Sequence, residues 1–262
     1  MRRHSLLLTI VIAVVIAAGL TWAALRHRGN AGGDVVAESR QLAPFSRIQV
    51  SGTAAVTLVQ DTNGPLVIET PARGKAQVDA VVRDNTLDIT ALDSRRWWDA
   101  LIGTGPSGEP RITVHFRDLD AISVAGGVRI TAAAVHVPAL RIDGAGGTSV
   151  TIADLRTESL RVSGEGALKA DLTGQATRQT VSISGAGDYR AEKLASSDTT
   201  VTVSGAGKVL VNVSKTLKAS ISGAGIVEYL GDPEVTQHVS GVGRVRRRES
   251  AEMAGPHIAL AR

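Results

Sequence analysis

Apolar and polar residues alternate with a period of two along most of the chain after residue 44. Residues 160–163 (LRVS) and 201–204 (VTVS) show the pattern, and Val209, Val211 and Val213 continue it. Strict alternation is typical of strands that have one apolar and one polar face, whereas a helix repeats every 3.6 residues. The pattern therefore predicts an all-β fold.

A short glycine motif of the form Ile/Val-Ser-Gly-Ala-Gly, with small variations, recurs six times in the second half of the chain. Its first glycines lie at nearly constant intervals, and they are Gly144, Gly164, Gly185, Gly205, Gly223 and Gly241. Such a regular return of one motif is typical of a solenoid, in which each repeat forms one rung. We expect a right-handed parallel β-helix of about seven rungs over residues 111–248, with rungs of about 18–21 residues.

Aligning the six motifs by their first glycine predicts which residues stack on neighbouring rungs. The aliphatic residue two positions earlier then forms one inward column, made of Ile142, Val162, Ile183, Val203, Ile221 and Val239. Polar residues between them face outward, and these are Arg141, Arg161, Ser182, Thr202, Ser220 and His238. The glycines fall where the coil turns a corner, so a bulky side chain there should clash with the next rung. We expect the motif serines to hydrogen-bond to the backbone of adjacent turns.

The segments around the repeats predict further parts of the architecture. Residues 44–92 hold five alternating runs separated by turn signals at 63–65 and 84–85, which we interpret as an N-terminal β-subdomain covering the first rung. Residues 93–110 fit neither pattern and should form a projecting loop. Residues 246–249 (RRRE) should end the solenoid because they cannot extend an apolar column, which leaves 249–262 as a C-terminal tail.

The N-terminus predicts export from the cytoplasm. Residues 6–25 are uncharged and apolar, and twenty residues in a helix span ~30 Å, the thickness of the hydrocarbon core of a bilayer. We interpret residues 1–28 as a membrane anchor, with a cleaved signal peptide as the alternative. Residues 29–43 then form a linker. The expected location is the inner (cytoplasmic) membrane, with a single pass and the β-helix on the periplasmic or extracellular side.

Composition and charge exclude several kinds of chemistry. The chain has no cysteine, which rules out disulfides, thiol catalysis and zinc-thiolate sites. Lys and Arg exceed Asp and Glu by only four, so nucleic acid is not an expected partner. Residues 103–108 match the dinucleotide string G-x-G-x-x-G, but a strand follows them where that motif needs a helix. We expect no cofactor and no metal.

A polysaccharide-active enzyme, either a lyase or a hydrolase, is the alternative function. Such chemistry needs carboxylates held together on neighbouring rungs, often beside a basic group. The best candidates are Asp188, Glu192 and Glu228, with Arg190 and Glu165 nearby in the repeats. Scattered surface charge explains these residues as well as catalysis does. We therefore assign no catalytic residue and expect a structure to show whether the acids converge.

Residues 93–110 also contain the most unusual surface sequence of the chain. Arg95, Arg96, Trp97 and Trp98 are consecutive, and paired Trp and Arg are typical of binding hot spots. We take these four residues as the candidate partner-binding site, directed at an envelope protein, a polysaccharide or the bilayer surface. The alternative is that both tryptophan rings are buried against the β-subdomain.

Three sequence features together resemble one known family. They are the repeated Ile/Val-Ser-Gly-Ala-Gly motif, residues 229–233 (YLGDP) and residues 45–52 (FSRIQVSG). Over residues 45–246 the chain resembles the head GIN domain family, which is named for an auto-transporter adhesin head. The resemblance implies a right-handed β-helix at the bacterial cell envelope without an established biochemical activity. The expected function is thus an envelope-exposed, non-enzymatic binding or scaffolding module.

Overall fold

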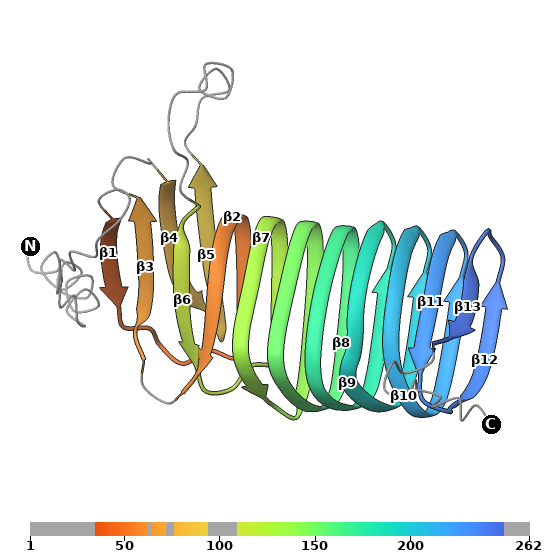
Figure 1. Cartoon of the computed structure of the whole chain (residues 1–262). Coiled ribbons are helices and arrows are strands. Elements are labelled where there is room, and N and C mark those ends of the chain that lie inside the picture. Colours follow the sequence, from red (N-terminus) through yellow and green to blue (C-terminus); the bar gives the residue numbers. More distant parts are fainter. Residues whose placement is uncertain (1–34, 62–63, 72–75, 94–108, 249–262) are drawn as a thin grey trace, which may run out of the picture.

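The protein folds as a β-solenoid of about six turns. The computed structural model describes residues 35–61, 64–71, 76–93 and 109–248, and these residues form thirteen strands of one sheet and no helix (Figure 1). This confirms the all-β expectation, with about six turns where the repeats suggested seven. No helix in the described segments is long and apolar enough to cross a membrane, and the predicted anchor over residues 1–28 lies outside them.

The strands follow one another around the coil, and some bend around corners without a break. Their bounds are β1 Val35–Arg40, β2 Arg47–Gln60, β3 Leu66–Pro71, β4 Ala76–Arg83, β5 Thr86–Asp93, β6 Arg111–Phe116, β7 Ala121–His136, β8 Ala139–Ile183, β9 Ala186–Val203, β10 Ala206–Ile221, β11 Ala224–Leu230, β12 Glu234–Val239 and β13 Arg244–Arg247. The longest, β8, holds 45 residues and therefore covers more than one complete turn.

The N-terminal strands build the first coil and cover its edge. Strand β2 pairs in parallel with β7 along Arg47–Leu58, so it is already a solenoid rung. Strands β5 and β6 lie on the other side of β2, against its first and second halves. Strand β4 then forms an antiparallel hairpin with β5, while β3 pairs antiparallel with β6 and β1 with β3. The strands of residues 44–92 thus share one sheet with the later rungs, and the division into a separate β-subdomain stays a prediction from the sequence.

The hairpin between β4 and β5 confirms a turn predicted from the sequence. Asp84 and Asn85 both have positive φ, at 48° and 62°. Two consecutive residues in this region are typical of the type I′ turn, whose twist matches the twist of the flanking strands. Asn85 also ties the hairpin to the coil, since its side-chain amide donates a hydrogen bond to Ser46 Oγ at 2.8 Å.

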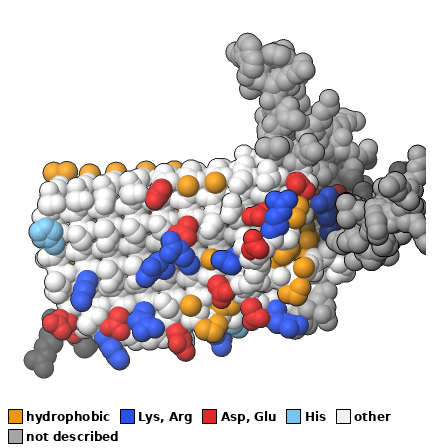
Figure 2. All heavy atoms as spheres, turned by 180° about the vertical axis from the view of Figure 1, so that it is seen from behind, with side chains coloured by type: hydrophobic (Ala, Val, Ile, Leu, Met, Phe, Trp, Pro, Cys, Tyr) orange, Lys and Arg blue, Asp and Glu red, His pale blue; other side chains and the backbone are white. Residues whose placement is uncertain are grey.

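Successive rungs stack in parallel register, as the recurring motifs predicted. Ala186 faces Ala206, and Ala206 faces Ala224, so these facing residues occupy the same position in successive motifs. Ile122 likewise faces Ile142 at the start of the repeats. The inward positions are aliphatic and almost fully buried, and Tyr189 and Phe116 are the aromatic residues among the core side chains. The outward face seen in Figure 2 carries acidic and basic side chains interspersed, without a continuous field of one sign.

The predicted aliphatic column is wrong in one respect, because two rungs pair with a different offset. The amide of Ser184 donates to the carbonyl of Gly164 at 2.9 Å, and Ala186 faces Ala167. The alignment by first glycines would place Ala186 opposite Glu165, so the observed pairing is shifted by two positions. Val181, and not Ile183, therefore continues the column of Val162. A slip of two positions leaves every side chain on the same face, so the alternation along the strands could not reveal it.

The corner where each motif lies is built from a column of stacked glycines. A Cβ atom added to Gly205 would lie 2.0 Å from the carbonyl oxygen of Gly185, and one on Gly185 would lie 2.1 Å from that of Gly166. The same close approach holds along the column, whose members are Gly52, Gly126, Gly146, Gly166, Gly185, Gly205, Gly223 and Gly241. The predicted clash of a bulky residue at the corner is thereby confirmed.

Candidate functional site: a polar groove across three strands

Asp188, Glu192 and Glu228, the acids considered for catalysis, are each paired with a cation. Asp188 faces Lys169 and Lys208 on the neighbouring rungs and binds Arg190 at 2.7 Å. Glu192 binds Arg248 at 3.3 Å. None of the register partners of Asp188 is an acid, and Glu165 lies exposed at the glycine corner. The arrangement is that of mixed surface ion pairs, which usually contribute little to stability.

Glu228 is held differently from the other acids, because its side chain is only 4% exposed. It lies between two cations, accepting hydrogen bonds from Arg246 and binding Lys208 Nζ at 3.2 Å. Arg246, followed by Lys208, holds the pKa of the Glu228 carboxyl below its usual value despite partial desolvation. An ionised carboxylate between two cations is suited to holding those cations in fixed positions. It is not suited to donating a proton as a general acid.

The predicted binding residues Arg95, Arg96, Trp97 and Trp98 lie outside the residues that the structure describes. The two alternatives for the tryptophan rings, partner binding and burial against the β-subdomain, therefore both stay predictions from the sequence. The predicted C-terminal tail, residues 249–262, also lies outside them, as does most of the predicted loop over residues 93–110.

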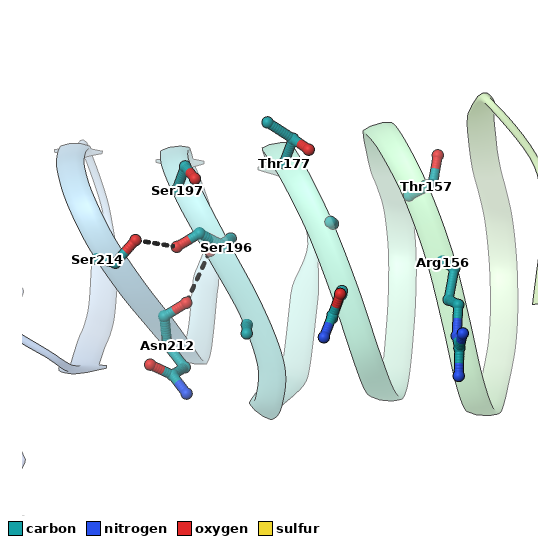
Figure 3. Close-up of a pocket in the computed structure, with 10 residues that line it drawn as sticks. Arg156, Thr157, Thr177, Ser196, Ser197, Asn212 and Ser214 are labelled. Atoms are coloured by element: carbon teal, nitrogen blue, oxygen red, sulfur yellow. Dashed lines mark hydrogen bonds between the residues drawn. The ribbon is translucent and has the colours of Figure 1, made fainter.

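A polar groove of about 430 Å³ runs across three strands on one side of the solenoid (Figure 3). We call it the polar groove, and its lining residues are Arg156, Thr157, Gln175, Ala176 and Thr177 of β8, Ala195, Ser196 and Ser197 of β9, and Asn212 and Ser214 of β10. Figure 3 shows the labelled side chains arriving from successive coils of the ribbon. The groove is therefore a product of the repeat and not of a single loop.

Small residues and a change of coil length explain why the surface is hollow here. Ala195 faces Gln175 on one side and Asn212 on the other, so a methyl group stands between two longer polar side chains. Val211 faces Ala191 but Asn212 faces Ala195, so residues 192–194 have no partner in β10. The register shift lets β10 take a shorter path than β9 along the groove.

Ser196 lies at the base of the groove, and its hydroxyl takes part in hydrogen bonds that hold the fold together. Its residue is 6% exposed, and its hydroxyl donates to the carbonyl of Asn212 at 2.7 Å and shares a hydrogen bond with Thr199 at 2.9 Å. Ser214 Oγ donates in turn to the carbonyl of Ser196 at 3.1 Å. These bonds, of which Figure 3 draws those to Asn212 and Ser214, tie β9 to β10 and leave Ser196 no role as a nucleophile.

Arg156 is the charged side chain among the described residues that line the groove. Arg156 donates to Asp154 at 3.3 Å, and Asp154 also binds His136 at 2.9 Å on the preceding rung. The hydrogen bond to His136, followed by that to Arg156, holds the pKa of Asp154 below its usual value. All three side chains are well exposed, so solvent screens their attraction.

The chemistry on offer in the groove is hydrogen bonding. The described lining residues carry hydroxyls, two amides and one guanidinium, and none of them has a carboxylate or imidazole that could act as a general base. Throughout the described segments, no group of three or more His, Cys, Asp or Glu side chains could hold a metal ion. Polar groups repeated at the rung spacing of ~4.8 Å can bind the hydroxyls of a sugar polymer.

The sequence also matches a protein family over residues 44–233, which is described as "Putative auto-transporter adhesin, head GIN domain". The match covers well over half of the chain. The chain belongs to the head GIN domain family. No functionally curated protein matches this head GIN domain.

Solved structures share the solenoid at low sequence identity. A putative adhesin from Bacteroides fragilis is 22% identical with a TM-score of 0.73, covering 83% of this chain and 98% of its own. A putative adhesin from Parabacteroides merdae is 18% identical with a TM-score of 0.62, covering 83% and 97%. A putative lipid binding protein from Parabacteroides distasonis is 16% identical with a TM-score of 0.61, covering 83% and 98%. At these identities the likeness shows the fold of the head GIN domain.

Sequence reasoning missed the polar groove of this head GIN domain. Thr177, Ser197 and Asn212 look like ordinary outward residues in an alternating pattern. The available signal was the interval from Gly205 to Gly223, which is shorter than the interval before it and indicates that a coil shortens close to Asn212. Which residues then line a hollow depends on the register, which alternation alone does not fix.

Proposed function

We propose that this head GIN domain is an envelope-exposed, non-enzymatic binding module that holds a polysaccharide along the polar groove. The observation that carries the proposal is the groove itself, which crosses three strands and presents uncharged hydrogen-bonding side chains from each of them. An open groove across stacked rungs suits a polymer better than a small molecule, because a polymer can bind successive rungs with successive units. The adhesin descriptions of the family and its structural neighbours agree with a role in binding.

A role without catalysis is supported by how the charged groups are placed. Asp188, Glu192 and Glu228 each bind a cation, and the groove contains none of them. A glycosidase needs two carboxylates flanking one bond, about 5–10 Å apart. The groove lining holds no such pair, so we favour retention of the polymer over its cleavage.

Membrane attachment is the second part of the proposal. The apolar segment over residues 6–25 is long enough to span a bilayer, and it precedes the solenoid by a short polar stretch. We propose that it anchors the protein in the inner membrane with the solenoid on the outer side. Extraction of cell membranes with alkaline carbonate should leave the full chain in the pellet, whereas a chain found only in the supernatant would contradict anchoring.

The arginine and tryptophan sequence is proposed as a second contact surface for the envelope. Replacing Trp97 and Trp98 with alanine should reduce crosslinking of the protein to envelope components, because such residues often carry much of the binding energy. Crosslinking that stays unchanged, in a variant that retains its β-sheet circular dichroism, would exclude this role for the two rings.

The groove is tested by removing its exposed polar groups without touching its floor. The triple variant Gln175→Ala, Thr177→Ala, Ser197→Ala leaves Ser196 and its hydrogen bonds in place. Loss of three hydrogen bonds at about 1 kcal/mol each should weaken binding to polysaccharide extracted from the host envelope by at least about tenfold. Binding of the full chain in mild detergent can be measured by titration calorimetry.

A matched control removes three hydroxyls from another part of the surface. Thr200, Thr202 and Ser220 point outward on the rungs before the glycine corner and do not line the groove. Changing all three to alanine should alter the affinity less than about twofold. Equal weakening by both triple variants, or none by the groove variant, would contradict the groove as the binding site.

A further inference from the structure

Positive charge is concentrated at the C-terminal end of the solenoid. Residues 204–248 contain seven Lys and Arg against three Asp and Glu, an excess of four, which equals the net charge of the whole chain. Four of the seven, Arg244, Arg246, Arg247 and Arg248, belong to the last coil, at the end of the solenoid opposite β1 (Figure 1). The excess of basic over acidic residues in the chain is thus concentrated at this end of the solenoid.

Four of the seven cations line a second groove of about 440 Å³, which we call the arginine groove. Its lining residues are Lys208, Glu228, Arg246, Arg247 and Arg248. They come from β10, β11, β13 and the residue after β13, so neighbouring coils again contribute side by side. Four cations and one carboxylate give the lining an excess of three positive charges.

Glu228 fixes the two inner cations in place. It faces Arg246 directly in the register of β11 and β13, and its carboxylate joins Arg246 to Lys208 across three successive strands. The carboxylate is buried and each cation is about half exposed, so Glu228 holds the two cations in place at the surface of the groove. A preorganised pair of cations loses less conformational entropy on binding an anion.

The outer two cations have weakly held partners. Arg247 binds Asp232, whose side chain is 90% exposed, and Arg248 binds Glu192, which is 40% exposed. Exposed pairs of this kind are worth at most about 1 kcal/mol, so an incoming anion can replace them. Among the described residues, Arg244 takes part in no ion pair and adds to the field from the same strand.

We propose that the arginine groove binds the anionic groups of an acidic polysaccharide, independently of the polar groove. Guanidinium groups bind carboxylate and phosphate in bidentate geometry, and here three of them, those of Arg246, Arg247 and Arg248, line one groove beside the ammonium group of Lys208. The groove lining contains no aromatic side chain on which a base could stack, which favours an acidic glycan over a nucleic acid.

The test measures binding of polygalacturonate, a carboxylate polymer, to the full chain in mild nonionic detergent, with dextran as the neutral comparison. The variant Arg244→Gln, Arg247→Gln, Arg248→Gln removes three cations and leaves the buried cluster of Glu228 intact. A control variant, Arg117→Gln, Arg161→Gln, Arg178→Gln, removes the same charge from exposed sites outside the groove. Circular dichroism establishes that both variants are folded.

The proposal predicts that polygalacturonate binds at least about tenfold more tightly than dextran, and that raising the salt from about 0.1 M to about 1 M weakens the binding of polygalacturonate at least about tenfold. The groove variant should lose about tenfold or more in affinity, and the control variant less than about twofold. Equal losses in the two variants would overturn the proposal. So would equal binding of single-stranded DNA or of phosphatidylglycerol vesicles through the same arginines, because the site would then not select a glycan.

Discussion

Gly205 shows how the absence of one carbon atom sets the distance between coils. The carbonyl of Gly185 occupies the place where a Cβ of residue 205 would lie, 2.0 Å away, and backbone atoms cannot move aside as a flexible side chain can. Gly147, only a few residues from the same corner column, has its nearest neighbours 4.0 Å from the corresponding position and no positive φ. The two glycines look alike in the sequence and carry different constraints.

Gly205→Ala should therefore destabilise the fold and Gly147→Ala should not. We expect a loss of about 3 kcal/mol for the first, the upper end of the range for overpacking, because two coils must separate. The second should change the free energy of unfolding by less than about 0.5 kcal/mol. Urea denaturation followed by circular dichroism measures both, and a similar stability of the two variants would contradict the stacked corner.

Gln179 and Tyr189 form a polar pair within the mainly aliphatic interior. Gln179 Nε2 donates to the hydroxyl of Tyr189 at 2.6 Å, and both residues are at most 1% exposed. Burial raises the pKa of the Tyr189 phenol well above its usual value, and the hydrogen bond from Gln179 opposes only part of this effect. The neutral phenol is the form that the interior accepts.

Removing the Tyr189 hydroxyl should leave Gln179 without its partner. We expect Tyr189→Phe to cost about 1–2 kcal/mol, and the double variant with Gln179→Leu to recover much of the loss, since an apolar pair needs no partner. Urea denaturation of the four members of this cycle measures the coupling. If the double variant is destabilised by the sum of the single effects, the two groups do not interact as described.

The same pair predicts a dependence of stability on alkaline pH. The phenol has a higher pKa folded than unfolded, so the folded state binds more protons once the unfolded phenol begins to ionise near pH 10. Its stabilising contribution is present below that pH and is lost as the pH rises further. Tyr189→Phe should show a smaller loss of melting temperature above pH 10 than the unchanged protein.

At the scale of elements, the motif is used in two different registers. In the motif that contains Gly164, the glycine lies before the corner and leaves room for the side chain of Leu168 after the corner. A Cβ on Gly164 would lie 2.8 Å from Leu168 Cδ2. In the motif that contains Gly187, the large side chain, Ile183, lies before the corner and the glycine lies after it. A Cβ on Gly187 would lie 2.8 Å from the side chain of Ile183. Each of these corners encloses one large side chain, and the glycine opposite it makes the space.

This exchange predicts a specific coupling between Gly164 and Leu168. Gly164→Ala should destabilise the protein because the new methyl group meets Leu168, and Leu168→Ala should destabilise it by leaving a cavity. Together the changes should cost at least about 1 kcal/mol less than their sum, because the methyl group then enters the cavity. Chemical denaturation of all four forms measures this, and strict additivity would contradict the shared space.

The same elements show what the sequence could and could not predict. Alternation and motif spacing correctly predicted strands, the stacked coils and the glycine corners, because each depends on a local period. The column that joins Val162 to Val181 was assigned wrongly, because a slip of two positions keeps every inward residue inward. The polar groove depends on that register and on the change in coil length beside Asn212, so its lining could not be listed from the sequence.

For the whole molecule, the solenoid places two grooves of different character on one rigid body. The polar groove crosses β8, β9 and β10, while the arginine groove lies toward the last coil. Both take side chains from several stacked strands, and in the polar groove the coil spacing that the glycine column sets also spaces the binding groups. The handedness of the coil and the N-terminal anchor stay predictions from the sequence.

The most direct test of the central claim, binding without cleavage, is to follow the polymer itself. The full chain is incubated with polysaccharide extracted from the host envelope, and light scattering measures the molar mass of the polymer before binding and after its release. We predict that the polymer is retained by the protein and released at unchanged molar mass. A falling molar mass would establish an enzyme, and a failure to retain any polymer would contradict the binding role.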